Sequence, residues 1–162
     1  MEITPEGYIE RLIEISSKKD GCLKEILHLT RTQSELINED GLDGLQKLID
    51  DKQRMIEEIN KADEDFNVYF TRLKQKLGVS NLDEINDPKI KGVKELQEII
   101  ARIMKLVGEI SELENQNIIK AKNLLNDFGS KIKSINEGKK VNNAYNNSSA
   151  MVSTSYYFDK KK

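Results

Sequence analysis

The 162-residue sequence has no tryptophan, two prolines, one cysteine and one histidine. Scarce proline leaves long stretches free to form helix, and the lone Cys22 has no partner for an internal disulfide. No run approaches the roughly 18 consecutive apolar residues of a membrane-spanning helix. The polar start MEITPEGYIERL lacks the pattern of a secretory signal. We therefore expect a cytoplasmic protein with no membrane insertion.

Charged residues are abundant and unevenly distributed. They make up 33% of the chain against 37% hydrophobic residues, which favours slender amphipathic helices over a thick globular core. The net charge of −2 divides into +3 for residues 137–162 and −5 for residues 1–136. Neither part has the concentrated basic face of a nucleic-acid-binding protein, so we expect no nucleic-acid partner.

Apolar residues at helical spacing predict an all-α fold. Thr4 and Pro5 are typical of a helix start, as N-cap and first helical residue. The polar connection at 38–41 is short, which favours an antiparallel α-hairpin between the first helix and a second helix at 42–77.

A third helix is expected to be the longest. Gly78 is typical of a helix end, and Asp87-Pro88 predicts the start of a new helix with the proline in its first turn. Apolar spacing then continues over 89–136. Residues 1–136 are therefore predicted to form one helical domain, an elongated three-helix bundle or coiled coil.

The apolar seams of these helices contain a few polar residues. Heptad positions in 42–77 are apolar at nine of eleven places, with Lys52 and Asp63 as the breaks. The third seam is interrupted at Glu114, Asn117 and Lys131. A polar seam residue such as Asn117 can fix helix register; alternatively, it faces water where the seam drifts.

Residues 137–162 differ in character from the rest of the chain. They contain no leucine or isoleucine and many asparagines and serines, so they cannot bury enough apolar area to fold alone. We expect a disordered tail. Yet the tail holds four of the nine aromatic residues of the protein: Tyr145, Tyr156, Tyr157 and Phe158.

Catalytic and metal-binding patterns are weak. Glu25 and His28 match the Glu-x-x-His spacing of di-iron bundles, but such sites need a second pair and two further carboxylates. Cys22 lacks a neighbouring base or basic cluster, so packing explains it better than nucleophilic catalysis. The glycines form no phosphate-binding loop. We expect a protein that is not an enzyme and has no cofactor and no metal.

Three local patterns together resemble the FlgN family of flagellar export chaperones. One is the leucine-rich stretch that follows the acidic connection, Leu42, Leu45, Leu48, Ile49, Lys52, Met55 and Ile56. Another is Glu112–Ile119, ELENQNII, continuing to Leu124, Leu125 and Phe128. The last is the end of the tail, Ser155–Lys160, where this chain has lysines after the aromatics and the family often has tyrosine followed by glycine.

The resemblance implies a carrier of other flagellar proteins. A member of this family would bind hook-filament junction proteins, FlgK or FlgL, in the cytosol and prevent their premature assembly. It would then present them to the export gate, whose receptor subunit is FlhA. An apolar stripe that receives an amphipathic helix suits this role, and we expect a monomer or weak dimer.

Two groups of residues are candidates for partner contact. The first is an apolar stripe late in the third helix, expected to bind cargo unless it is ordinary bundle core: Leu124, Leu125, Phe128, Ile132 and Ile135. The second consists of the tail aromatics Tyr156, Tyr157 and Phe158, which could dock on the gate or on cargo, or fold back onto the bundle.

A rival function is that of a structural coiled-coil or scaffold protein whose seams serve only self-association. A scaffold would form stable oligomers that do not respond to cargo. A chaperone would gain helix when cargo is added. A di-iron bundle enzyme is a third alternative, and it would contain bound metal.

Overall fold

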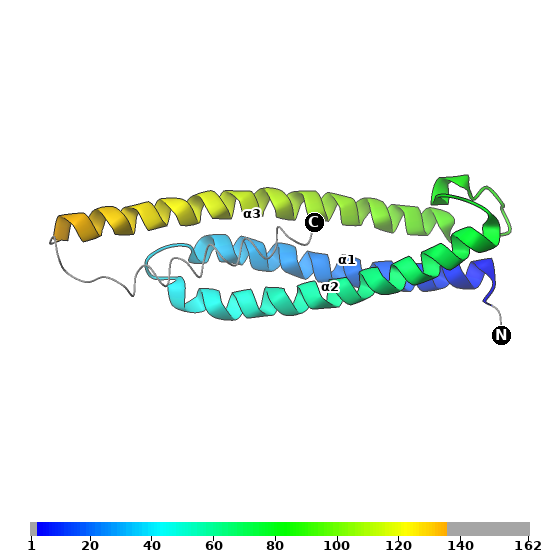
Figure 1. The fold of residues 1–162 in the computed structure, drawn as a ribbon, viewed down its shortest axis with the longest axis horizontal. Helices are drawn as coiled ribbons and strands as arrows, with labels where there is room; N and C mark the ends of the chain where they lie inside the picture. Colours follow the sequence, from blue (N-terminus) through cyan, green and yellow to red (C-terminus); the bar gives the residue numbers. More distant parts are fainter. Residues whose placement is uncertain (1–2, 136–162) are drawn as a thin grey trace. The chain divides into compact units, whose positions relative to one another are not determined.

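The computed structural model describes residues 3–135, which form three long α-helices and one short 3-10 helix. In chain order, they are α1 (Pro5–Leu36), α2 (Leu42–Leu77), η1 (Leu82–Glu84) and α3 (Val93–Ile135), as Figure 1 shows. No strand occurs within this range, so the all-α prediction is confirmed. The tail expected at 137–162 lies outside the described residues.

The helices contribute to two compact units. Unit 1 comprises Met1–Glu25 and Met55–Val107. Unit 2 comprises Ile26–Arg54 and the part of α3 that begins at Gly108. Each long helix therefore supplies one segment to each unit, and each unit has its own interior.

Unit 1 has an aliphatic core with an aromatic border. Its buried residues come from every element: Ile9 and Leu12 from α1, Leu73 from α2, Leu82 from η1 and Leu96 from α3. Half-buried aromatic rings pack against this core, with the ring centroids of Tyr8 and Tyr69 6.3 Å apart and those of Phe66 and Phe70 5.5 Å apart. This interior holds η1 and the start of α3 against the two other helices.

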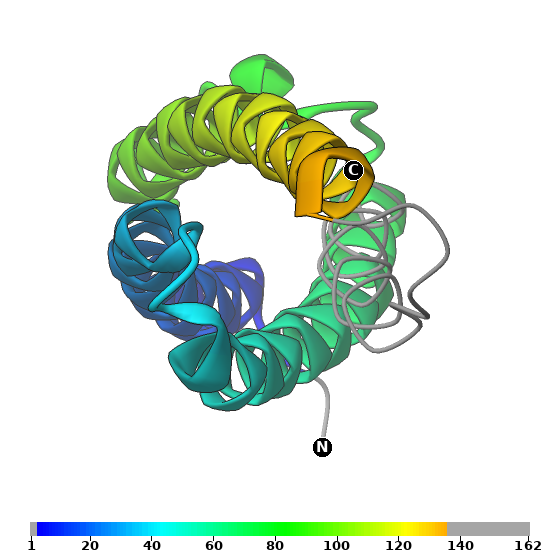
Figure 2. The same cartoon turned by 90° about the vertical axis from the view of Figure 1, so that its left-hand side faces the viewer.

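Unit 2 contains the connection of the predicted α-hairpin, with the end of α1 and the start of α2. The Asn38 side chain stabilises the connection, because its Oδ1 accepts hydrogen bonds from the backbone N–H groups of Asp40 at 2.9 Å and Gly41 at 2.8 Å. Ile37 and Leu45 are buried here together with Ala121 of α3. Figure 2 looks at the chain from this end, with the connection, the start of α2 and the end of α3 nearest the viewer.

Two helix ends follow the sequence signals. The Thr4 Oγ1 accepts a hydrogen bond from the Gly7 N–H at 3.0 Å, so Thr4 caps α1 as predicted. α2 ends before Gly78, whose φ is +66°, and the Val79 N–H donates to the Lys74 carbonyl at 3.1 Å. Both boundaries agree with the predicted ones.

The predicted start of the third helix is wrong. Asp87 and Pro88 form a turn instead, in which the Asp87 carbonyl accepts from the Ile90 N–H at 3.0 Å. The Asp87 Oδ1 also accepts from the Lys89 N–H at 2.9 Å. Proline suits the second position of such a turn as well as it suits a first helical position, so this dipeptide indicates either structure. α3 begins five residues after Pro88, at Val93.

Gly92 explains why α3 begins where it does. Its φ is +92°, a conformation that L side chains rarely adopt. Its carbonyl accepts the hydrogen bond from the Leu96 N–H at 2.9 Å. A Cβ at this position would lie 2.9 Å from the Ile9 Cγ2 and 3.1 Å from the Ile13 Cδ1. The backbone therefore turns into the helix in direct contact with α1 of unit 1.

Candidate functional site

The candidate cargo stripe lies on the last third of α3, in unit 2. Leu124, Leu125, Phe128 and Ile132 are all half-buried, which is neither the burial of a core residue nor full exposure. Leu124 packs against the cluster formed by Ile37, Leu45 and Ala121. The stripe therefore begins at the edge of the interior of unit 2 and continues outside it.

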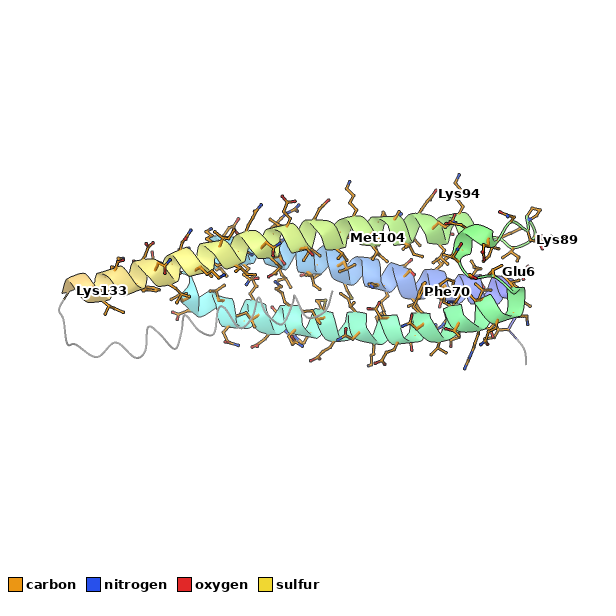
Figure 3. All side chains as sticks on the ribbon, turned by 45° about the horizontal axis from the view of Figure 1, so that its top comes forward. Glu6, Phe70, Lys89, Lys94, Met104 and Lys133 are labelled. Atoms are coloured by element: carbon orange, nitrogen blue, oxygen red, sulfur yellow. The ribbon has the colours of Figure 1, made fainter. Side chains whose placement is uncertain are left out.

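The end of the stripe extends past the α1–α2 connection, as Figure 1 shows for the orange turns of α3. The Lys131 ammonium pairs with the Glu39 carboxylate of that connection. Lys133 follows almost at the end of the helix (Figure 3). Ile135 is the last residue of α3, and its side chain lies outside what the structure describes. Tyr156, Tyr157 and Phe158 also lie outside the described residues.

The interior of unit 2 contains a set of polar side chains that we call the polar layer. Its members come from all three helices and are each at most 3% exposed: Thr30, Gln33, Lys52, Glu114 and Asn117. The Lys52 ammonium donates hydrogen bonds to the Gln33 Oε1 at 2.8 Å and to the Glu114 carboxylate. The polar break in the seam of α2 therefore meets a polar break in the seam of α3.

The remaining members connect the layer to α1. The Thr30 hydroxyl donates a hydrogen bond to the Ile26 carbonyl at 2.7 Å. The Glu114 Oε1 lies 3.4 Å from the same Thr30 hydroxyl. The Asn117 amide donates to the Thr30 carbonyl at 3.2 Å. Asn117 is thus buried and bonded across helices, which supports its interpretation as a register-fixing residue over the alternative of a water-facing one.

Burial sets the electrostatics of the layer. Loss of hydration lowers the pKa of the Lys52 ammonium, and the neighbouring Glu114 carboxylate partly opposes this change. The second carboxylate oxygen, Glu114 Oε2, is buried and accepts no hydrogen bond from any residue between 3 and 135. The layer therefore holds opposite charges in contact, with one acceptor left unsatisfied.

The polar layer could be anticipated only in part from the sequence. Lys52, Glu114 and Asn117 stand out as polar residues at apolar seam positions. Their pairing depends on the register of α3 on the hairpin, which brings together residues 62 positions apart. Asp63, the other break in the α2 seam, pairs with Lys19 of α1 at 2.6 Å in unit 1. Both breaks are thus matched by opposite charge.

The other candidate chemistry does not assemble into a site. His28 and Glu25 are exposed on α1, and no cluster of three or more metal-ligating side chains occurs between residues 3 and 135. Cys22 is half-buried, and both burial and the nearby Glu58 raise the pKa of its thiol.

Cys22 is expected to be a slow nucleophile. A raised pKa leaves less thiolate at a given pH, and the thiolate is the reactive form. Alkylation by iodoacetamide at pH 7.5 should be slower than that of free N-acetylcysteine. The rate should keep rising above pH 9, the ordinary range of a thiol. A rate at neutral pH equal to or above that of the free thiol would contradict this expectation.

Comparison with known proteins places the chain in a family. A family model described as FlgN protein matches residues 1–153, nearly the whole chain. No curated protein and no solved structure matches. Within the part of the chain that the structure describes, no helix is long and apolar enough to cross a membrane. The chain belongs to the FlgN family, whose members are flagellar export chaperones with flagellar proteins as their partners.

Proposed function

We propose that this protein binds hook-filament junction proteins of the FlgK or FlgL type in the cytoplasm, as a monomer or weak dimer. It covers their amphipathic terminal helices, prevents premature assembly and delivers them to the export gate, where FlhA receives them. The observation that supports the cargo step most directly is the half-buried stripe on the last third of α3. Membership of the FlgN family supports the general role.

The geometry of the stripe suits a helix-in-groove complex. An amphipathic partner helix needs apolar anchors about one turn apart. Leu125, Phe128 and Ile132 provide them at spacings of three and four residues, which is one face of a helix. Because these side chains are only partly covered, a partner can contact them without displacing a complete core.

The stripe can be tested with purified proteins. Phe128→Ser should weaken binding of a FlgK-like or FlgL-like protein from the same organism by about 10-fold or more, since buried aromatic anchors dominate helical interfaces. Isothermal titration calorimetry of the full-length chain measures the affinity. The matched control is Ile119→Ser, an apolar residue of the same helix that is 60% exposed and lies outside the stripe.

The outcomes separate the candidate functions. Weaker binding by the Phe128 variant with unchanged binding by the Ile119 variant supports the stripe as the cargo surface. Equal binding by the wild-type chain and both variants would mean that cargo binds to a surface other than the stripe. If no junction protein binds and the chain forms stable oligomers by light scattering, the scaffold function is favoured instead.

The tail aromatics have a separate role in the proposal. Tyr156, Tyr157 and Phe158 are proposed to dock on the gate subunit or on cargo. A variant with all three replaced by serine should keep the helix content of the wild-type chain by circular dichroism. Titration of this variant against cargo and against the cytoplasmic part of FlhA identifies which partner uses the tail, and unchanged binding to both would refute a docking role.

A further inference from the structure

The interiors of the two units differ in polarity. Among the described residues, unit 1 buries eleven apolar and two polar or charged residues, whereas unit 2 buries seven apolar and five polar or charged ones. The five in unit 2 are the members of the polar layer. Apolar burial is the main favourable term in folding, so the larger polar share of the interior means that unit 2 gains less per buried residue.

The polar layer offers little stability in return. A buried ion pair loses hydration on both partners, and its attraction roughly offsets that loss only when every polar atom is satisfied. Here Lys52 and Glu114 are paired, but Glu114 Oε2 has no donor among the described residues. The layer defines which face of α3 packs on the hairpin. It contributes less to the stability of unit 2 than an apolar layer of the same volume would.

α3 also changes unit at a weak point of the helix. Its first part belongs to unit 1, and its second part begins with Gly108 in unit 2. Glycine is a poor helix former compared with alanine, and, apart from its chain neighbours and the adjacent backbone of its own helix, no atom lies within 4 Å of where a Gly108 Cβ would be. The exposed Gly108 therefore makes the junction between the two parts of α3 a weak point of the helix.

We propose that unit 2 opens locally at the polar layer: the part of α3 after Gly108 separates from the α1–α2 hairpin while unit 1 stays folded. Opening exposes Leu124 together with the Ile37 and Leu45 side chains against which it packs. The partner that fits the exposed surface is an amphipathic helix, which buries its apolar face against both sides. This second step rests on the proposed function, whereas the opening itself does not.

Hydrogen exchange of the full-length chain without any partner tests the opening. Core amides of unit 2, in residues 26–54 and 110–132, are expected to exchange about 10-fold or more faster than those of unit 1. A variant with Lys52→Met and Glu114→Leu should slow the exchange of unit 2 by about 10-fold while leaving unit 1 unchanged. Equal exchange rates of the two units in the wild-type chain would overturn the proposal, and this comparison needs no variant.

Partner binding tests the second step. The same double variant should bind a synthetic terminal helix of a junction protein about 10-fold more weakly, since a population shift toward the closed state lowers the apparent affinity. Unchanged affinity despite slowed exchange would show that partners bind without opening. If the wild-type chain opens but binds no junction helix, the proposed cargo is wrong and the opening of unit 2 still holds.

Discussion

Replacing Lys52 by methionine is expected to lower the free energy of unfolding by about 3–5 kcal/mol, the loss typical of breaking a buried ion pair from one side. Methionine has a similar shape to lysine, so the main change is the loss of the positive charge. Glu114 is 0% exposed, and the substitution would leave its carboxyl group buried without its ammonium partner. Urea denaturation followed by circular dichroism at 222 nm measures the loss.

The double variant provides the internal control for this prediction. With Glu114→Leu added, no charge is left unpaired, and stability should exceed the wild-type value by about 1–4 kcal/mol. Lys47→Met, at an exposed position of the same helix, should change the free energy by less than about 0.5 kcal/mol. A Lys52→Met loss as small as that of Lys47→Met would mean that the ammonium is hydrated and the layer is not closed.

Replacing Gly92 by alanine is expected to cost about 2–4 kcal/mol of stability. Part of this cost is conformational, because a φ of +92° strains any residue with a Cβ. The remainder is steric, because the new methyl group would lie 2.9 Å from the Ile9 Cγ2, and Ile9 is buried in the core of unit 1. Thermal and urea denaturation of the variant measure the total loss of stability from these two contributions.

Replacing a second glycine of unit 1 by alanine should raise the stability of the protein instead of lowering it. Gly21 lies inside α1, its φ is not positive, and, apart from its chain neighbours and the adjacent backbone of α1, no atom lies within 4 Å of where a Cβ would be. Gly21→Ala is therefore expected to stabilise the protein by about 0.5–1 kcal/mol, through better helix propensity and a less flexible unfolded chain. Similar effects of the two substitutions would show that Gly92 is not constrained by its contact with α1.

Local signals in the sequence were sufficient to predict most of the fold. The Thr4 cap, the polar connection after α1 and the Gly78 stop act within a few residues of the chain, so α1 and α2 were placed correctly. The sequence does not predict the start of α3 correctly, because Asp87-Pro88 suits a turn and a helix start equally well. The close approach of the Gly92 backbone to Ile9 is a tertiary feature that the local sequence does not contain.

The candidate site could be predicted less completely. Helical spacing identifies Leu124, Leu125 and Phe128 as one apolar face, but only the position of the α1–α2 connection determines how much of that face is covered. Likewise, the seam pattern marks Lys52 and Glu114 as exceptions without pairing them. That pairing requires the register of two helices far apart in the chain, and heptad analysis of one helix at a time contains no such information.

The order of the two units along the chain has a consequence for synthesis on the ribosome. Unit 1 is complete in sequence once residue 107 has been made, although its first segment ends at Glu25. At that moment unit 2 consists of the hairpin alone, and Lys52 has no Glu114 to meet. Since domains fold as their sequence becomes available, unit 1 can fold first, and the polar layer closes afterwards, together with the cluster of Ile37, Leu45 and Ala121.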